Sequence, residues 1–190
     1  MKTSNQTAPV RLFCALPLPE ETSAAISRWT GELKRSISFR KWVHHQDYHI
    51  TVQFLGDTET SVIPAITAAL RQAALDQPSF QLNLKGAGAF GQPASPRILW
   101  AGIEGETENL NMLHKRVTEA MVPFGFKPEE RPYKPHITAA RKYTGGVMPA
   151  GLLEQGPEPV GWKADSFVLY RTRMDKIPMY EILERFTFGN

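Results

Sequence analysis

The sequence predicts an α+β domain built from antiparallel sheets that carry helices on one side. Two observations support this fold class. Segments with strand-like and helix-like patterns alternate as strand, helix, strand in both halves of the chain. The tripeptide His-Ile-Thr opens an apolar, strand-like run twice, at His49 and again at His136. The two halves therefore resemble each other in architecture, although no further residue-by-residue repeat connects them.

The composition is that of one globular domain. Of the 190 residues, 42% are hydrophobic and 22% are charged, which gives enough apolar material for a buried core. The net charge of +3 tolerates a phosphate-bearing partner but is far too small for a protein that coats nucleic acid. We expect residues 1–9 to be a flexible tail and residues 10–190 to form a single domain of two lobes.

The sequence carries no signal for a membrane or an oxidising compartment. Cys14 is the only cysteine, so an internal disulfide and a cysteine-based metal cluster are excluded. The first ten residues lack the apolar run of a signal peptide, and no segment approaches the ~20 apolar residues of a membrane span. We therefore expect a cytoplasmic protein without a membrane partner.

The N-terminal half is predicted as strand, helix, strand, helix. Residues 11–16 are short, apolar and followed by prolines, as at the end of a strand. Residues 19–35 have acidic residues first, basic residues last and apolar residues at helical spacing. Residues 49–56 form a second strand that ends at a glycine, and residues 61–75 form a second helix with a proline near its beginning.

The C-terminal half contains more strands. Residues 79–90 begin with alternating apolar and polar side chains, which is the pattern of a half-buried strand. Residues 108–125 place apolar side chains on one side of a helix. Further strands are predicted at residues 97–103, 136–143, 165–172 and 179–188.

The repeated tripeptide places a histidine and a threonine on one face of each strand. Side chains two residues apart on a strand point to the same side. His49 and Thr51 therefore share a face, while Ile50 points to the helices and fixes the register. His136 and Thr138 repeat the arrangement. If the halves pack about an approximate two-fold axis, both pairs line one cleft.

Two imidazoles and two hydroxyl groups without a carboxylate in either motif suit phosphoryl chemistry. One neutral imidazole can take a proton from an attacking water, and the other, as imidazolium, can protonate the departing oxygen. The threonine hydroxyls can donate to the non-bridging oxygens, where charge accumulates. Because side chains handle both proton transfers, this reaction needs neither a metal ion nor another cofactor.

Four segments resemble the 2H phosphoesterase superfamily, and within it the RNA 2′,3′-cyclic phosphodiesterases, historically called 2′-5′ RNA ligases. The resemblance implies a LigT-like fold of two lobes with pseudo-two-fold symmetry, helices on the outside and a central cleft. It also implies that the domain at residues 10–190 hydrolyses a ribonucleotide 2′,3′-cyclic phosphate to a 2′-phosphomonoester without a metal. The matching segments are RLFCALPLP from Arg11, HITVQFLGD from His49, PRILWAGI from Pro96 and KPHITAARK from Lys134.

The resemblance implies a role for each motif residue. His49 matches the family's proton donor to the leaving 3′ oxygen, and His136 matches the proton acceptor that activates water. Thr51 and Thr138 match phosphate ligands. Arg141 matches a family arginine near the phosphate.

Arg141 can lie near the phosphate only if its side chain reaches the same face of the strand as His136. Strict alternation puts Arg141 on the opposite face from His136. The match therefore requires the strand to bend or to end by Ala140.

Three aromatic residues complete the predicted substrate-binding set with Arg141. Phe13 and Cys14 point to opposite faces of the first strand, and either can look into the cleft. Trp42 lies in a segment where basic and aromatic residues alternate, as single-stranded nucleic acid would require. Tyr133 directly precedes the second motif and can border the substrate.

Two alternative functions use the same residues. One is a non-catalytic module that binds RNA ends or nucleotides. The other is reversible joining of RNA halves through a 2′-5′ bond. The expected partners are RNA ends or cyclic nucleotides that carry a 2′,3′-cyclic phosphate, and we expect the protein to be a monomer.

Overall fold

The computed structural model describes residues 8–92, 94–149 and 151–189. Most of the predicted tail at residues 1–9 lies outside these ranges. The helices are α1 (Glu20–Leu33), α2 (Ile63–Leu75) and α3 (Thr107–Met121), with short 3-10 turns η1 (His45–Asp47), η2 (Thr60–Val62) and η3 (Val122–Phe124). The strands are β1 (Val10–Pro17), β2 (Phe39–Trp42), β3 (His49–Thr58), β4 (Phe80–Gln92), β5 (Ser95–Gly105), β6 (Ile137–Tyr143), β7 (Gly161–Ala164), β8 (Ser166–Thr172) and β9 (Tyr180–Thr187).

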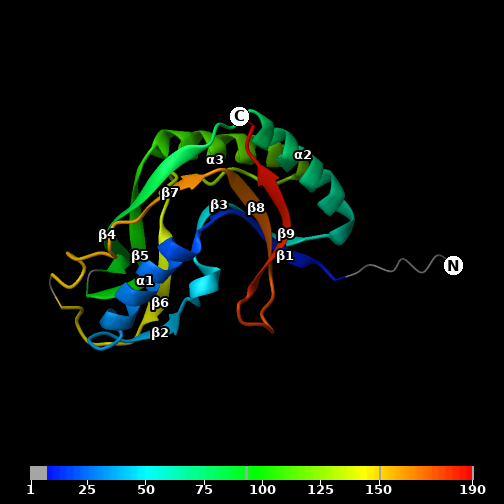
Figure 1. The fold of residues 1–190 in the computed structure, drawn as a ribbon. Coiled ribbons are helices and arrows are strands. Elements are labelled where there is room, and N and C mark those ends of the chain that lie inside the picture. The colour runs from blue at the N-terminus through cyan, green and yellow to red at the C-terminus, as the bar shows by residue number, and fades with distance from the viewer. Residues whose placement is uncertain (1–7, 93, 150, 190) are drawn as a thin grey trace.

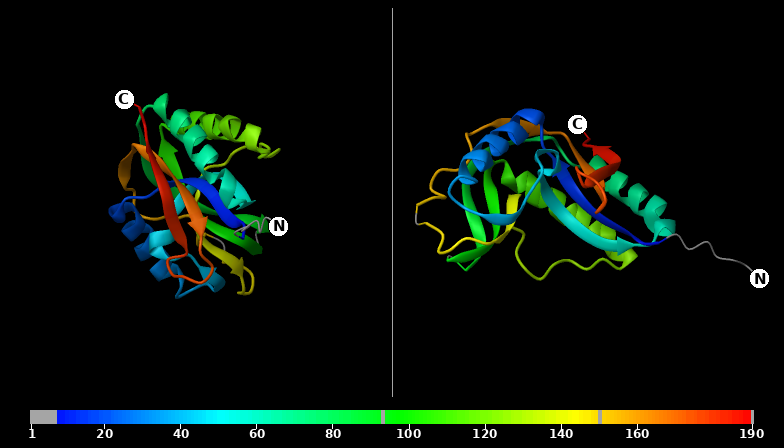
Figure 2. Two further views of the ribbon diagram at one scale, coloured as in Figure 1. Left: turned by 90° about the vertical axis from the view of Figure 1, so that its right-hand side faces the viewer. Right: turned by 90° about the horizontal axis from the view of Figure 1, so that it is seen from below.

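The strands form one antiparallel sheet that curves into an arch (Figure 1). The order across the sheet is β7-β4-β5-β6-β3-β1-β8-β9, and β2 pairs with β6 outside this path. Helices α2 and α3 lie along the outer side of the arch (Figure 1). Figure 2 shows the β4–β5 hairpin at one end of the molecule and the beginning of β1 at the other.

The arch consists of two related halves that meet at the β3–β6 seam. In one half, α1 connects the neighbouring antiparallel strands β1 and β3; in the other, α3 connects β5 and β6 in the same way. Along the main strand path, which leaves out β2, four strands lie on each side of the seam. The predicted α+β fold with two pseudo-symmetric lobes is therefore confirmed, with the sheets of the lobes joined edge to edge into one.

The main core lies between the sheet and the helices. Ile50 and Ile137, the central residues of the repeated tripeptides, are fully buried in it. Burial of such a side chain stabilises the fold by about 1.5–3 kcal/mol, and a one-residue slip of the strand would lose that contribution. The predicted buried faces of two helices are also in this core: Ala25, Ile26, Trp29 and Leu33 of α1, and Leu110, Leu113, Val117 and Met121 of α3.

The structure differs from the sequence-based prediction in two short strands. Strand β2 has four residues, of which Arg40 and Lys41 are exposed, so its sequence reads as a basic loop. Strand β7 also has four residues and directly follows the Gly- and Pro-rich segment at 144–160. Both are short strands whose pairing partners, β6 and β4, lie far away in the sequence. None of the described helices is long and apolar enough to cross a membrane.

Candidate active site

The seam places the two His-Ile-Thr motifs side by side on neighbouring strands of the sheet. Ile50 of β3 pairs directly with Ile137 of β6 in an antiparallel register. This register sets His49 opposite Thr138, and Thr51 opposite His136. Side chains in such positions have Cβ atoms about 4.5–5.5 Å apart. Because the isoleucines point into the core under the helices, the histidines and threonines project together from the other, concave face of the sheet.

Each imidazole is fixed by a backbone carbonyl two residues earlier in the chain. Nδ1 of His49 lies 2.7 Å from the carbonyl oxygen of Asp47, and Nδ1 of His136 lies 2.6 Å from that of Lys134. A carbonyl oxygen can only accept, so Nδ1 carries the hydrogen in both rings. Nε2 is thereby left for proton transfer, and in His49 it lies 3.1 Å from Oγ1 of Thr51.

Aromatic rings surround both imidazoles. The ring centroid of His49 lies 4.9 Å from that of Phe13 and 5.2 Å from that of Tyr180. The ring of Phe90 meets His136 edge-on at 4.9 Å, and Trp100 lies further away at 6.5 Å. Of these rings, Phe13 alone was singled out from the sequence; Phe90, Trp100 and Tyr180 come from other strands and were not predicted as site residues.

Burial lowers the pKa of both imidazoles. The pKa of His49 falls to about 4, because loss of solvation outweighs the hydrogen bond from Nδ1 to the Asp47 carbonyl. The charge of Arg141 lowers it further, and the Asp47 carboxylate raises it. For His136, burial is again the main cause and Arg141 adds to it. Both rings are therefore neutral at pH 7 in the free protein.

An irregularity in β6 brings Arg141 to the concave face. Thr138 pairs with Trp100 of β5, but Ala140 pairs with the next residue, Leu99, so Ala139 is an extra residue in the ladder. The alternation of side chains is shifted by one from that point. This satisfies the condition for Arg141, whose charge acts on the pKa of both histidines.

Lys41, one of the basic residues in the segment around Trp42, is a further cation at this face that was not among the predicted site residues. It pairs directly with Arg141 across β2 and β6, and its Nζ lies 3.6 Å from Sδ of Met179. Its neighbour Trp42, predicted to bind substrate, packs against Phe39 with a centroid distance of 5.4 Å and borders the main core. The alternation of a strand allows only one of Lys41 and Trp42 to face the site. The alternation of Lys41 and Trp42 could have been predicted from the sequence if residues 39–42 had been recognised as a strand.

Phe13 and Cys14 lie on opposite sides of β1. Phe13 has 2% of its surface exposed and packs behind His49, so it supports the imidazole. Direct contact of Phe13 with substrate remains a prediction. Cys14 is buried in the main core, and burial raises the pKa of its thiol.

Tyr133 lies behind the first motif, close to the seam. Its hydroxyl donates to the carbonyl oxygen of Thr51 at 2.8 Å, and its ring stacks on His114 at 4.0 Å. Nδ1 of His114 donates to the carbonyl oxygen of Val52 at 2.7 Å. These two side chains supply hydrogen bonds to β3 just beyond Ile50, its one residue paired with β6.

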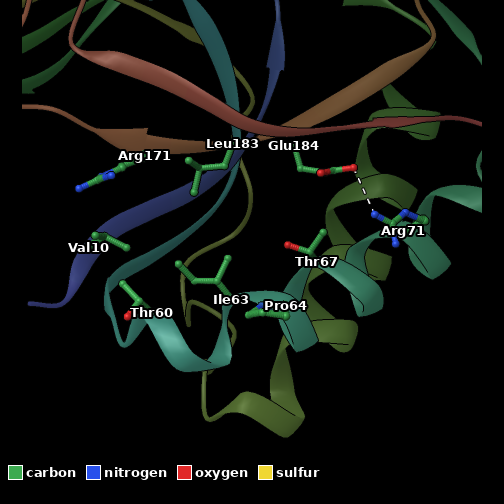
Figure 3. A pocket seen from close by; sticks show the side chains of 9 residues that line it. All are labelled: Val10, Thr60, Ile63, Pro64, Thr67, Arg71, Arg171, Leu183 and Glu184. Atoms are coloured by element: carbon green, nitrogen blue, oxygen red, sulfur yellow. Dashed lines mark hydrogen bonds and ion pairs between the residues drawn. The ribbon is translucent and has the colours of Figure 1, made fainter. Parts of the chain in front are cut away.

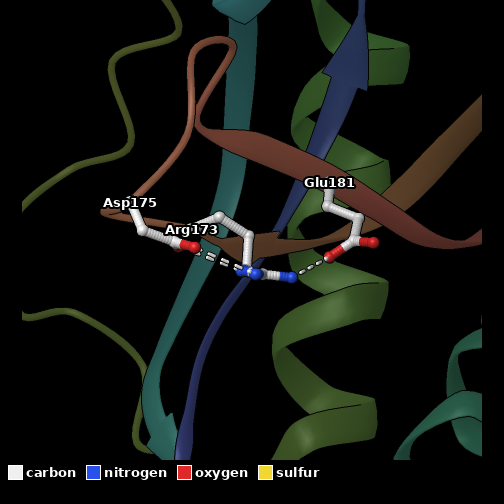
Figure 4. A network of polar contacts seen from close by, with 3 residues as sticks. All are labelled: Arg173, Asp175 and Glu181. Atoms are coloured by element: carbon white, nitrogen blue, oxygen red, sulfur yellow. Dashed lines mark hydrogen bonds and ion pairs between the residues drawn. The ribbon is translucent and has the colours of Figure 1, made fainter.

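Two open grooves lie away from the paired histidines. One, of about 580 Å³, lies between α2 and β9 and is lined in part by Ile63, Leu183 and Arg71, which pairs with Glu184 at 3.2 Å (Figure 3). The other, of about 380 Å³, includes Arg173, which pairs with Asp175 at 3.1 Å and Glu181 at 3.4 Å (Figure 4). Neither contains a motif histidine or threonine. Within the described ranges, no three His, Cys, Asp or Glu side chains gather as a metal site would require.

The pseudo-symmetric sheet and the paired His-Ile-Thr motifs define a two-histidine phosphoesterase. The family model described as the 2′-5′ RNA ligase superfamily matches residues 18–176. The chain therefore belongs to the 2′-5′ RNA ligase superfamily.

Several relatives are similar over most of the chain. A protein of Geobacillus stearothermophilus named RNA 2′,3′-cyclic phosphodiesterase is 40% identical over 92% of this chain, which spans only 56% of that protein. A protein of Bacillus subtilis strain 168 with the same name is 31% identical over 92% of this chain and 94% of its own length. The crystal structure of E. coli LigT complexed with 3′-AMP has a TM-score of 0.80, with 25% identity, and covers 96% of this chain and 99% of its own.

Proposed function

We propose that the protein hydrolyses the 2′,3′-cyclic phosphate of RNA ends or nucleotides to a 2′-phosphomonoester. One observation carries this proposal: two imidazoles, each held through Nδ1, lie on paired strands of one sheet, and Nε2 of His49 lies 3.1 Å from the hydroxyl of Thr51 in its own motif. The relatives named RNA 2′,3′-cyclic phosphodiesterase support the choice of substrate. The buried thiol of Cys14 fits a reducing, cytoplasmic compartment, and all residues of the site come from one chain, which fits a monomer.

The phosphate is held by hydroxyl groups and a cation. Thr51 and Thr138 lie diagonally across the seam, so their hydroxyls can donate to the two non-bridging oxygens. Arg141 supplies the balancing positive charge on the same face. This arrangement stabilises the charge that grows on the phosphoryl oxygens in the transition state.

The histidines act on opposite sides of the phosphorus. His136 takes a proton from water through Nε2 while the water oxygen forms a bond to phosphorus. The bond from phosphorus to O3′ breaks, its electron pair remains on O3′, and the proton on Nε2 of His49 moves to that oxygen. The product is a 2′-phosphomonoester with a free 3′-hydroxyl. The proton taken up by His136 and that lost by His49 balance over the cycle.

The proton of His49 arrives with the substrate. Burial keeps this imidazole neutral at pH 7 in the free protein. The negative charge of the cyclic phosphate favours the imidazolium form and so raises the pKa of the ring. Substrate binding and protonation are therefore coupled.

Product analysis by ³¹P NMR tests this proposal. We expect adenosine 2′,3′-cyclic phosphate to give the 2′-phosphate, at a rate unchanged by EDTA. Formation of the 3′-phosphate would refute the assigned direction of opening. Binding without opening would identify a nucleotide-binding module instead.

Joining of RNA ends is a second candidate because of the rings beside His136. A water molecule needs no aromatic surface, yet Phe90 and Trp100 lie on the side from which the nucleophile approaches. A nucleoside stacked there could attack through its 5′-hydroxyl. Incubation of RNA 2′,3′-cyclic phosphate with a 5′-hydroxyl strand should then give a 2′-5′ joined product, which Trp100→Ala should reduce more than it reduces hydrolysis. Equal reduction of both reactions would argue against this role of Trp100.

A further inference from the structure

A buried carboxylate lies directly beside the first motif. Asp47 has 5% of its surface exposed and ends the turn η1. Its Oδ2 accepts the backbone N–H of Met179 at 3.0 Å, and its Oδ1 accepts that of Tyr180 at 3.1 Å. A buried carboxylate is costly unless such hydrogen bonds compensate it, and these two bonds fix its position beside the motif.

The same residue holds His49 in two ways, through its backbone carbonyl and through Tyr180. The carbonyl oxygen of Asp47 accepts the Nδ1 hydrogen at 2.7 Å, which leaves the transferable proton on Nε2. The carboxylate anchors Tyr180, whose ring packs edge-on against the imidazole at 5.2 Å. Phe13 fills the angle between them, 4.9 Å from His49 and 4.8 Å from Tyr180.

The second motif repeats the backbone contact but not the charge. Lys134 stands two residues before His136, as Asp47 stands before His49, and its carbonyl oxygen also accepts the Nδ1 hydrogen. The side chain of Lys134 is exposed. The two halves therefore hold their imidazoles alike, while only His49 has a buried negative charge beside it.

We propose that Asp47 is a positioning residue that assigns the proton-donor role to His49 and leaves the acceptor role to His136. This proposal rests on the proposed cyclic phosphodiesterase activity. A nearby carboxylate favours the imidazolium form, which a proton donor must adopt, and the carbonyl directs the proton to the leaving oxygen.

The other groups around His49 do not duplicate this effect. Arg141 and His136 disfavour its imidazolium form. The phenols of Tyr170 and Tyr180 are neutral at pH 7, because burial raises the pKa of Tyr170 to about 12 and also raises that of Tyr180. Among the charged groups acting on His49, Asp47 is therefore the one that favours its proton.

Substitution of the leaving atom tests this role. An alkoxide at O3′ needs a proton to depart, whereas a thiolate at a 3′-bridging sulfur does not. In Asp47→Asn, which keeps the size of the side chain, we expect kcat for adenosine 2′,3′-cyclic phosphate to fall roughly 10- to 100-fold, a share of what general acid catalysis contributes. The rate for the 3′-bridging sulfur analogue should stay within about three-fold of that of the unmodified protein.

Three variants make the result specific. His49→Gln should show the same dependence on the leaving atom, and His136→Gln should slow both substrates. Asp57→Asn, which changes an exposed carboxylate of β3 paired with Arg11, should alter neither rate. The chemical shifts of ¹⁵N-labelled His49 should show a lower pKa in Asp47→Asn than in the unmodified protein.

A purely structural role predicts a different outcome. If Asp47→Asn slowed the oxygen and sulfur substrates by the same factor, or slowed neither, the proposal would be wrong. An unmodified protein that opens neither substrate would refute the proposed activity itself, and this inference with it. Thermal unfolding followed by circular dichroism establishes that Asp47→Asn is folded at the assay temperature.

Discussion

At the scale of single residues, the site depends on which ring nitrogen carries the hydrogen. The carbonyl oxygens of Asp47 and Lys134 fix Nδ1–H in His49 and His136. Both Nε2 atoms are thereby left for the proposed proton transfers at one phosphorus. In the proposed mechanism, neither ring can be replaced by a group that lacks this second nitrogen.

Removal of either imidazole should abolish turnover while the fold remains. General acid and general base catalysis each contribute roughly 10²- to 10⁴-fold, so we expect His49→Ala and His136→Ala to lower kcat/KM by at least about 10²-fold. Hydrolysis of adenosine 2′,3′-cyclic phosphate measures the loss. His45→Ala, which removes an exposed imidazole from the nearby turn η1, is the matched control. Full activity in either motif variant would remove that histidine from the mechanism.

The pH dependence should report the lowered pKa values. The donor must be protonated and the acceptor neutral, so kcat/KM should follow a bell that falls at low pH and at high pH. Because burial lowers the pKa of His49 to about 4 and also lowers that of His136, the maximum should lie below the ordinary imidazole pKa of about 6.5. The maximum of kcat should lie at higher pH, since bound phosphate favours the imidazolium. A flat profile of kcat/KM between pH 4 and pH 8 would contradict this assignment.

At the scale of elements, the irregularity in β6 decides what Arg141 can reach. The extra residue Ala139 shifts the alternation of side chains. Lys142, which directly follows Arg141, adopts a left-handed backbone conformation with φ of 60°. A regular strand would point Arg141 into the apolar core. The strand geometry, and not the residue type alone, therefore decides whether Arg141 can make the proposed phosphate contact.

Loss of the Arg141 charge should weaken phosphate binding. A charge-assisted hydrogen bond contributes about 1.5–3 kcal/mol, so Arg141→Gln should weaken inhibition by inorganic phosphate roughly 10- to 100-fold. Lys142→Gln removes an exposed cation from the next position and should change inhibition little. Steady-state inhibition constants give the comparison. Equal effects of both substitutions would mean that only general surface charge matters.

The contact of Tyr133 with β3 should stabilise the fold more than it assists catalysis. The Tyr133 hydroxyl donates a hydrogen bond to the backbone carbonyl oxygen of Thr51, and Tyr133→Phe would remove this donor. We expect a loss of about 1–3 kcal/mol in the free energy of unfolding. Urea titration measures it, and kcat should change less than about three-fold. A large loss of kcat at unchanged stability would instead place the hydroxyl in the reaction.

Local patterns predicted most elements, and long-range pairing explains what they missed. The helical spacing of Leu110, Leu113 and Val117 predicted α3 because each helix buries one stripe of its own sequence. The shift at Ala139 depends on how β6 pairs with β5, which no local pattern records. The carbonyl acceptor for Tyr133 lies in a strand far away in sequence. The motif residues could be predicted because each pair lies within three residues, but the supporting role of Phe13, the other rings and Asp47 could not.

At the scale of the whole molecule, each half contributes one His-Ile-Thr motif to a single site. A single residue pair, Ile50 with Ile137, joins the two motif strands. The histidine and threonine side chains beside this pair therefore come from both lobes. The halves are alike in backbone and differ in charge, since the buried carboxylate of Asp47 accompanies only the first motif. Symmetry in the fold thus provides two imidazoles, and in the proposed mechanism the asymmetry of the surrounding charges separates their roles.

The central claim is that His49 and His136 act together on one phosphate group. Titration of ¹⁵N-histidine-labelled protein with adenosine 2′-phosphate, the proposed product, tests it most directly. We expect the Nε2 resonances of both histidines to shift with the same dissociation constant, while that of His45 stays unchanged. A shift of only one motif histidine, or two shifts with different dissociation constants, would contradict the account.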